Sequence, residues 1–301
     1  MPSSGRPQRE EVAAMAGAIV KPVRTIGVIS TYLDDYIFTG ITRGIEATLT
    51  ARGHRMQLAF TRNMVENEQR VLCSMLEQGV DGLIVEPTKS GLPLINSALY
   101  HRIHARGIPL IFFNSYYPSL PFFPHVSMDD VEAGRRSTCC LLERGHRKIA
   151  GVFQCDDLQG HRRYEGYIRA LQEHRVKLDS SRVLWFATGD LPYLAKDFAR
   201  VERVIEGCTG LVCYNDQVAF TLCREFARRG IRVPEDLSVS SIDDSELATV
   251  CTPPLTSVGH PMEALGSTAA EHILRLIDEP DFNATMEFSP PVAERASIRT
   301  V

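Results

Sequence analysis

The sequence predicts an α/β protein of two doubly wound parallel-sheet lobes joined by a multi-strand hinge. Strand and helix patterns alternate from residue 25 to about residue 245, and such alternation is typical of parallel sheets covered by helices on both faces. The same layout also occurs twice, each time as an apolar strand, a helix and a repeat of that unit. Two similar lobes leave a cleft between them, and clefts are where small ligands bind.

The first copy of the layout begins at residue 25. Phe38, Ile41, Ile45 and Leu49 recur at the spacing of one helical face. The run from Gly82 to Glu86 is almost continuously apolar, as expected for a parallel strand buried on both faces. The predicted strands are 25–30, 55–60, 82–86 and 109–114, and the predicted helices are 38–49 and 68–77.

The second copy begins at Asp129, after a segment rich in proline. Its predicted helices are 130–144, 162–174, 193–206 and 216–229, and its predicted strands are 148–153, 183–186, 210–214 and 237–242. The tail adds a strand at 255–258, a long helix at 261–277 and a last strand at 295–299. A long helix after the second copy fits a chain that returns to the first lobe, and such crossovers would form the hinge.

These patterns divide the chain into a tether and two lobes. A chain of 301 residues is long enough for about two domains. We expect a tether over residues 1–23, a first lobe of 24–126 plus 260–290, and a second lobe of 127–259 plus 291–301.

The bulk composition is that of an ordinary soluble protein, with 44% hydrophobic and 23% charged residues. The formal net charge of −4 leaves no basic footprint for nucleic acid. The eight cysteines form no Cys-x-x-Cys pair, which suits a reducing cytoplasm. No run of 18 apolar residues occurs, so we expect a cytoplasmic protein without a membrane span.

Signatures of catalysis are absent from the sequence. It contains no nucleophile elbow, phosphate-binding loop, zinc-protease motif or dinucleotide fingerprint. His101 and His104 stand three residues apart without a carboxylate or thiolate at a matching spacing, which favours a surface pair over a metal site. We therefore expect no enzyme activity, no cofactor and no bound metal.

Polar and aromatic side chains gather where the predicted strands end. Ligands of open α/β sheets bind beyond the carboxyl ends of the strands. The alternative is that the Asp and Asn residues simply cap the next helices and that the aromatic residues pack in the core, but neither account needs Lys89. The candidates from the residues themselves are Tyr32, Asp35, Tyr36, Phe38, Glu86, Lys89, Asn114, Asp157, Gln159, Asn215 and Asp243.

This set of side chains suits a sugar. Each buried hydroxyl needs a hydrogen-bond partner, and a missing one costs about 1–3 kcal/mol. Carboxylates and amides match vicinal hydroxyls, and the fork of Arg163 offers donors to two of them. Two other classes stay open on these residues alone: a solute-binding protein of a sugar transporter, and a hydrolase or kinase acting on the sugar.

Three segments resemble the effector domain of the lactose/galactose-repressor family. They are Cys213 to Ala219, Val233 to Asp244 and Leu255 to Val258. The resemblance covers roughly residues 24–301 and implies a periplasmic-binding-protein-like fold.

Finer features resemble one branch of that family, the arabinose repressors. They lie in Thr31 to Phe38, Leu83 to Ser90 and Asp156 to Gly160. In that branch a GntR-type winged helix is fused to a sugar-sensing domain, and the protein acts as a homodimer with L-arabinose as its effector. First-lobe helices near 41–52 and 68–78 are our candidates for the dimer face, where Met75 and Leu76 fit equally well in the core.

The resemblance also implies roles for single residues. Arg163 matches an arginine that holds sugar hydroxyls, Asn215 an amide and Asp243 a carboxylate, while Asn114 and His260 match positions that face the ligand. Glu86 and Lys89 belong to the branch-specific loop. On this basis Arg163→Ala should abolish binding and leave the melting curve nearly unchanged.

The chain departs from the branch at its beginning. No winged-helix pattern precedes residue 22. We therefore expect operator DNA to be contacted only through a DNA-binding domain that is missing here. Sugar binding between the lobes would then control DNA binding by a shift between two lobe angles.

Overall fold

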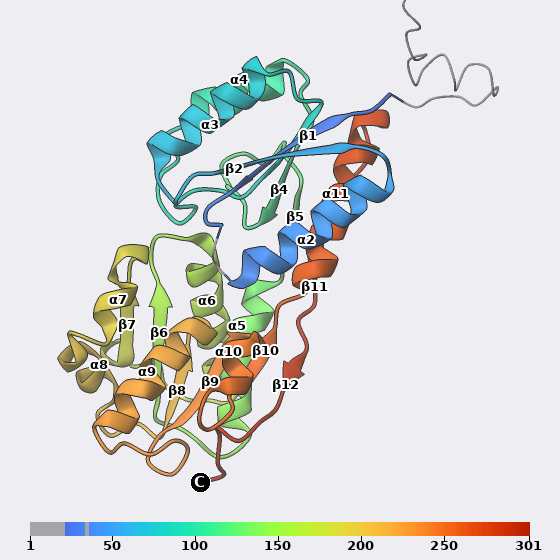
Figure 1. Cartoon of the computed structure of the whole chain (residues 1–301). Helices are drawn as coiled ribbons and strands as arrows, with labels where there is room; N and C mark the ends of the chain where they lie inside the picture. The colour runs from blue at the N-terminus through green and yellow to red at the C-terminus, as the bar shows by residue number, and fades with distance from the viewer. Residues whose placement is uncertain (1–21, 34–35) are drawn as a thin grey trace, which may run out of the picture.

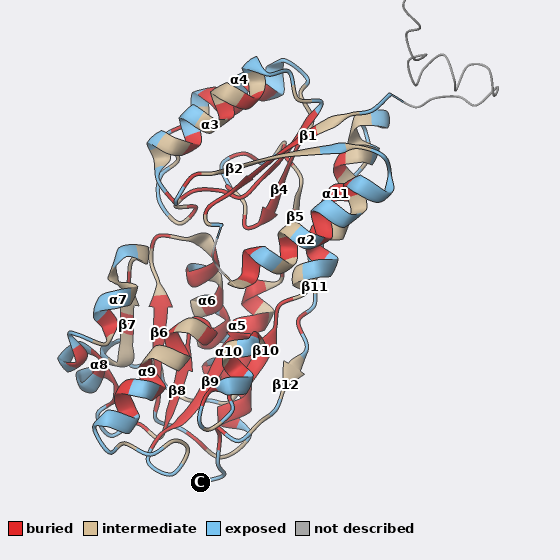
Figure 2. Cartoon of the chain, in the orientation of Figure 1, coloured by how far each residue is buried: buried red, intermediate tan, exposed pale blue. Residues whose placement is uncertain are grey.

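A computed structural model describes residues 22–33 and 36–301 and confirms the predicted fold class. Two α/β lobes lie end to end, each with one sheet between layers of helices (Figure 1). The central strands of each sheet are buried, and the outer faces of the helices are exposed (Figure 2). In the described part of the chain, each sheet contains six strands.

The first lobe contains the start of the chain and a later return. Its strands and helices follow the predicted order, with α4, β5 and β11 as additions that the sequence patterns did not reveal. The elements are β1 (Thr25–Ser30), α2 (Tyr36–Ala51), β2 (Arg55–Phe60), α3 (Val65–Glu77), β3 (Gly82–Val85), α4 (Ser97–Ala105), β4 (Leu110–Asn114), β5 (His125–Met128), α11 (Met262–Asp278) and β11 (Met286–Phe288). The strand order is β11-β5-β4-β3-β1-β2, all parallel.

The second lobe repeats this arrangement. Its strand order is β12-β10-β9-β8-β6-β7, and only β12 runs antiparallel to its neighbour. The elements are α5 (Asp130–Leu142), β6 (Ile149–Gln154), α6 (Leu158–Glu173), β7 (Val183–Phe186), α7 (Leu191–Leu194), α8 (Phe198–Ile205), β8 (Gly210–Cys213), α9 (Asp216–Arg228), β9 (Ser238–Asp243), α10 (Glu246–Val250), β10 (Thr256–Gly259) and β12 (Val292–Ala293), with short 3-10 turns at Ser180–Arg182 and Thr188–Asp190.

Two predicted elements of the second lobe are wrong. The helix predicted at 193–206 is two helices, α7 and α8, separated by residues 195–197. Asp197 is the N-cap residue of α8, and its backbone (φ −100°, ψ 56°) leaves the helical conformation without a side-chain capping hydrogen bond.

The strand predicted at 295–299 is also wrong, because the last strand is β12. In this segment the Ser297 hydroxyl bonds to the backbone of two neighbouring strands, where a regular strand would bond through its own backbone. Its Oγ accepts a hydrogen bond from the Thr256 amide at 2.8 Å and donates to the Val239 carbonyl at 2.6 Å.

The chain passes between the lobes three times, after β5, after β10 and after β11. These crossings form the multi-strand hinge, and they lie on the side of the molecule where β11 and β12 are found (Figure 1). The predicted lobe borders at 259/260 and 290/291 lie at crossings, whereas the border at 126/127 falls inside β5, before the first crossing. The extent of each folding unit stays a prediction.

Glycine pairs bring two helices of each lobe into close contact. A Cβ on Gly266 of α11 would lie 2.0 Å from the Ile41 carbonyl oxygen of α2. In the second lobe, a Cβ on Gly134 of α5 would lie 2.0 Å from the Arg163 carbonyl oxygen of α6, and one on Gly166 would lie 2.0 Å from the Val131 oxygen. Only glycine allows this approach of backbones, so the duplicated layout extends to the helix packing.

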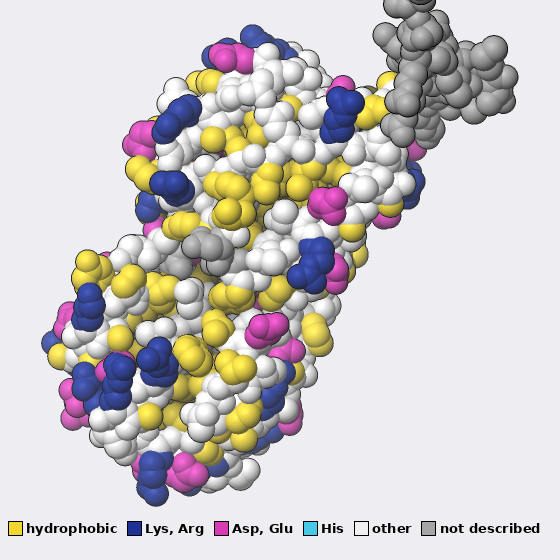
Figure 3. Space-filling view, in the orientation of Figure 1, with side chains coloured by type: hydrophobic (Ala, Val, Ile, Leu, Met, Phe, Trp, Pro, Cys, Tyr) yellow, Lys and Arg dark blue, Asp and Glu magenta, His cyan; other side chains and the backbone are white. Residues whose placement is uncertain are grey.

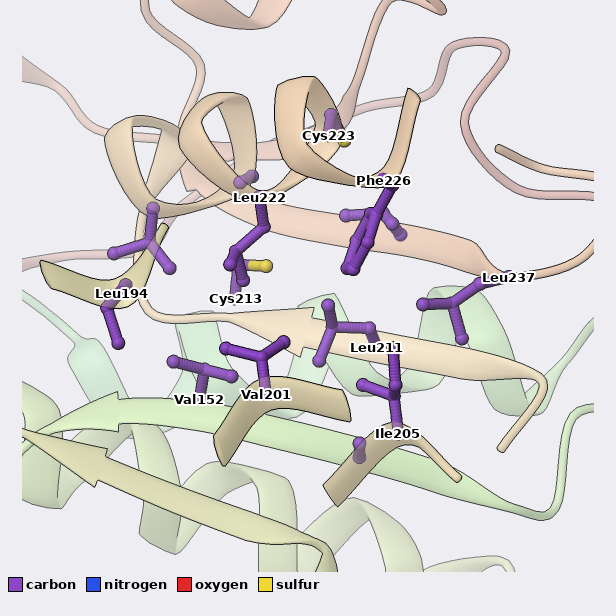
Figure 4. Packing of buried hydrophobic residues seen from close by; sticks show 14 of the residues in the cluster. Val152, Leu194, Val201, Ile205, Leu211, Cys213, Leu222, Cys223, Phe226 and Leu237 are labelled. Atoms are coloured by element: carbon purple, nitrogen blue, oxygen red, sulfur yellow. The ribbon is translucent and has the colours of Figure 1, made fainter. Parts of the chain in front are cut away.

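The second lobe has its largest core cluster between the sheet and helices α7, α8 and α9. Leu211, Leu222 and Phe226 interdigitate there with Val201 of α8 (Figure 4). Their burial, at about 1.5–3 kcal/mol for each large side chain, holds the strand ends of this lobe in place.

Two features of the described residues bear on possible partners: the apolarity of the helices and the distribution of charged side chains on the surface. None of the described helices combines the length and apolarity that crossing a bilayer requires. Positive and negative side chains are interspersed over both lobes (Figure 3), as the net charge of −4 predicts.

Candidate functional site

A cavity of about 330 Å³ lies between the two lobes, where the carboxyl ends of both sheets meet. This volume is at the lower end of the range of small-molecule pockets, about 300–1,000 Å³. Eight of the predicted site residues line it: Tyr32, Phe38, Glu86, Lys89, Asn114, Asp157, Gln159 and Asn215.

The other predicted residues lie elsewhere. Arg163, Asp243 and His260 are buried and bond to residues of the cavity wall or to one another instead of lining the cavity. Tyr36 reaches across from the first lobe and donates a 2.5 Å hydrogen bond to Asp243. Asp35 lies outside the described residues.

The first-lobe wall is organised by the buried carboxylate of Glu86. Its Oε2 accepts hydrogen bonds from the Thr31 amide and hydroxyl, both at 2.7 Å, and its Oε1 accepts one from Asn114 Nδ2 at 2.9 Å. Through these hydrogen bonds the Glu86 carboxylate connects the carboxyl ends of β1 and β4. Ligand hydroxyls at this wall would therefore meet a carboxylate of fixed position.

Arg163 lies behind the second-lobe wall and supports it through Tyr214. Its side chain is 1% exposed, and its Nε donates to Asp130 at 2.8 Å while Nη1 donates to the Tyr214 carbonyl at 2.8 Å. The guanidinium also lies 4.7 Å from the centre of the Tyr214 ring and 3.5 Å from a carboxylate oxygen of Asp243. Its Nη2 has no hydrogen-bond partner among the described residues.

His260 connects the hinge to the first lobe. Its Nε2 lies 3.0 Å from Asn114 Oδ1, and the Asn114 amide nitrogen already donates to Glu86. We therefore assign the proton of the neutral ring to Nε2. Its Nδ1 is then a buried acceptor, which has no hydrogen-bond partner in the part of the chain that the structure describes.

Burial, helped by the nearby Arg163 charge, lowers the pKa of His260 to about 3. The ring is ordinarily half protonated at about pH 6.5 when unfolded. Because the folded-state pKa is depressed, this residue contributes stability above pH 6.5 that is lost as the pH falls toward 3.

We predict that the stability advantage of the wild type over His260→Gln shrinks by about 2 kcal/mol between pH 7 and pH 5. Urea unfolding of both proteins at several pH values measures the difference, which removes the contributions of all other groups. A difference that stays constant over this range would contradict the assignment of a neutral, buried ring.

Asp157 and Asn215 serve as helix caps and line the cavity at the same time. Asp157 accepts from the Gly160 amide at 2.6 Å and Asn215 accepts from the Val218 amide at 3.0 Å. The capping interpretation is therefore confirmed for both, and it does not compete with a place in the cavity wall. Burial raises the pKa of Asp157 to about 6, although a 2.5 Å hydrogen bond from Tyr214 opposes that shift.

The backbone at the strand ends is strained. Lys89, Asn114, Asp243 and Asp244 have positive φ angles of 49°, 64°, 114° and 50°. Such conformations cost about 1–3 kcal/mol each in a non-glycine residue and cluster at functional sites.

Sequence reasoning missed several residues of the wall. Asn63 follows β2 and Thr188 follows β7, and both line the cavity together with Ser90 and Tyr214. The strand-end rule would have found Asn63 and Thr188 if it had been applied to the two edge strands as well as to the central ones.

Residues 140–298 match the family of periplasmic binding protein-like domains. The arabinose metabolism transcriptional repressor of Halalkalibacterium halodurans is 39% identical over 261 residues, which are 85% of this chain and 68% of that protein. The chain belongs to the periplasmic-binding-protein-like family, in the branch of the arabinose metabolism transcriptional repressors. A second repressor of this name, from Geobacillus stearothermophilus, is 38% identical over 260 residues, 85% of this chain and 71% of that protein.

The solved structures agree with this membership. The transcription regulator CcpA of Lactococcus lactis superposes with a TM-score of 0.81 at 26% identity, over 92% of this chain and all of that one. The predicted resemblance is thus confirmed, and membership in a family of repressors favours a sugar-binding regulator over a transporter protein. The relatives named are transcriptional repressors, which are not enzymes.

Proposed function

We propose that this chain is the effector-binding module of a transcriptional regulator, and that it binds a neutral monosaccharide, L-arabinose first among them, in the cavity between its lobes. The observation that carries the proposal is the chemistry of the cavity wall. It combines two carboxylates, one lysine and six amide side chains with apolar and aromatic surface. The charged and amide groups come from Glu86, Asp157, Lys89, Asn63, Asn114, Gln154, Gln159, Asn215 and Gln217.

We infer binding instead of catalysis at this site. The cavity carboxylates are already engaged by structural donors, Glu86 by Thr31 and Asn114 and Asp157 by Gly160 and Tyr214. Carboxylates whose oxygens already accept hydrogen bonds from the protein are fixed in position, which suits them to orient ligand hydroxyls. We propose no cofactor for the site.

Regulation would follow from a shift in the angle between the lobes. A ligand shifts such an equilibrium only by binding one state more tightly, and a change from 1:99 to 99:1 takes about 5.5 kcal/mol. A cavity with walls from both lobes supplies contacts that exist in the closed state alone. We propose that the protein acts in the cytoplasm as a homodimer and reaches operator DNA through a domain outside this chain.

Calorimetric titration with L-arabinose, D-xylose, D-galactose and D-ribose tests the ligand class. D-arabinose 5-phosphate and L-arabinonic acid serve as anionic controls. We expect heat of binding with at least one neutral sugar. We expect none with the anions, because the carboxylates of Glu86 and Asp157 repel the negative charge of the ligand. Binding of the anions alone would contradict the proposal.

Gln159→Met should weaken sugar binding by roughly ten- to a hundredfold, because a lost partner of a buried hydroxyl costs about 1–3 kcal/mol. Gln159 lines the cavity, whereas Gln172 of the same helix is exposed. Gln172→Met is therefore the matched control and should keep wild-type affinity in the same titration. Equal affinities of the two variants would remove Gln159 from the site.

A further inference from the structure

Four polar residues, two from each lobe, form a closed ring of hydrogen bonds across the cleft. Lys89 Nζ lies 3.0 Å from Asp156 Oδ2, and Asp156 Oδ1 accepts from the Thr188 amide and hydroxyl, both at 3.0 Å. Thr188 Oγ1 accepts from Asn63 Nδ2 at 3.0 Å, and Asn63 Oδ1 accepts from the Lys89 amide at 2.9 Å. Each residue of the ring is therefore hydrogen-bonded to the two residues beside it.

This ring lies away from the hinge. Asn63 and Thr188 follow β2 and β7, which are edge strands of the two sheets, whereas the hinge crossings leave from β5, β11 and β10 near the opposite edges. The labels of β2 and β7 stand on one side of the molecule and those of β11 and β12 on the other (Figure 1). Rotation about the hinge separates the lobes most at the β2 and β7 edge, so contacts there have the greatest influence on the lobe angle.

Backbone contacts beside the ring depend on closure in the same way. The Leu158 amide donates to Ser90 Oγ at 2.9 Å, and the Gly91 amide donates to the Asp156 carbonyl at 3.3 Å. A Cβ on Gly91 would lie 2.7 Å from the Asp157 carbonyl oxygen of the other lobe. Glycine is needed at this position for the two backbones to meet.

We infer that Asn63, Lys89, Asp156 and Thr188 form a clasp that stabilises the closed lobes before a ligand is bound. Asn63, Lys89 and Thr188 also line the cavity, whereas Asp156 does not. All bonds of the clasp run between protein groups, and the Asp156 side chain is 3% exposed, so solvent screens its pair with Lys89 only in part. The clasp sets the fraction of closed protein before binding. The apparent affinity for a ligand scales with that fraction, so the clasp tunes the effector threshold.

Two variants open the cleft by different routes. Asp156→Asn removes the charge that pairs with Lys89 and keeps the size of the side chain. Gly91→Ala places a methyl group against Asp157 of the opposite lobe, and neither Gly91 nor Asp156 lines the cavity. Asp236→Asn is the matched control, because it removes a carboxylate from an exposed pair with Arg232 in the same lobe.

Hydrogen exchange and small-angle X-ray scattering of the unliganded protein test the clasp directly. We expect faster exchange of the Leu158 amide and a larger radius of gyration in both variants, with unchanged exchange in β3 and β8 as a check on folding. Asp236→Asn should match the wild type. Wild-type exchange at Leu158 and wild-type scattering in both variants would overturn the clasp.

Affinity for the sugar is the second readout, and it alone rests on the proposed function. We expect both variants to bind the best neutral sugar roughly tenfold more weakly, with an unchanged order of preference among sugars. If the wild type binds none of the sugars, the proposed function fails, while exchange and scattering still decide the clasp. Wild-type affinity in variants that are measurably more open would overturn its control of the effector threshold.

Discussion

Arg163→Ala is expected to abolish sugar binding and to destabilise the unliganded protein by about 3–5 kcal/mol. The guanidinium is 1% exposed and lies between Asp130 and Asp243, whose side chains are 4% and 0% exposed. Removal leaves two carboxyl groups in a buried site without their cation. Burial already raises the pKa of Asp130 against the effect of Arg163, so little else there stabilises the charge.

Urea unfolding and calorimetric titration of the folded variant measure the two effects separately. Arg163→Lys keeps the charge but loses the fork that contacts Asp130 and the Tyr214 carbonyl together. We expect it to recover part of the stability and little of the affinity. An Arg163→Ala protein with the wild-type unfolding midpoint would contradict the buried network, although the sequence alone had led us to expect that result.

Gly134→Ala is expected to destabilise the second lobe by about 3 kcal/mol, at the upper end of the usual cost of overpacking. The new methyl group would meet the backbone of Arg163 at 2.0 Å, and a backbone inside a helix has no rotamer to move away. The change also shifts α6 and with it Arg163, so we expect weaker sugar binding.

Gly189→Ala is the matched control for this prediction. A Cβ at Gly189 meets nothing within 4 Å, so its unfolding midpoint should stay close to that of the wild type. Urea unfolding of the three proteins decides the matter. Equal midpoints for Gly134→Ala and Gly189→Ala would mean that α5 and α6 do not pack through this glycine.

The sequence predicted most of the strands because their signal is local. Continuous apolar runs such as Gly82 to Glu86 have one stable solution in a chain of this length, a strand buried between helices. The helix predicted through Asp197 and the strand predicted around Ser297 were wrong because a turn at residues 195–197 and a side-chain hydrogen bond replaced the regular patterns. Neither effect changes the periodicity of the apolar residues.

The sequence indicated where the cavity lies, but it indicated less well which residues line the cavity and which support its wall. Polar strand ends placed Glu86, Asn114 and Asp157 at one cavity, since the carboxyl ends of parallel strands share an edge. Asn63 and Thr188 were missed because the strand-end rule was applied to the central strands and not to the edge strands β2 and β7. Their hydrogen bond across the cleft depends in addition on how closely the two lobes approach. That approach is a property of the hinge, which no run of neighbouring residues encodes.

The sequence by itself determined the duplicated α/β architecture, the family resemblance and the polar character of the strand ends, because all three are written in short stretches of neighbouring residues. Only the tertiary structure decided that Arg163 is a buried counter-ion, that His260 bonds to Asn114, and that both lobes are joined by a clasp. These facts depend on distances between residues far apart in the chain, and such distances follow from packing and not from pattern.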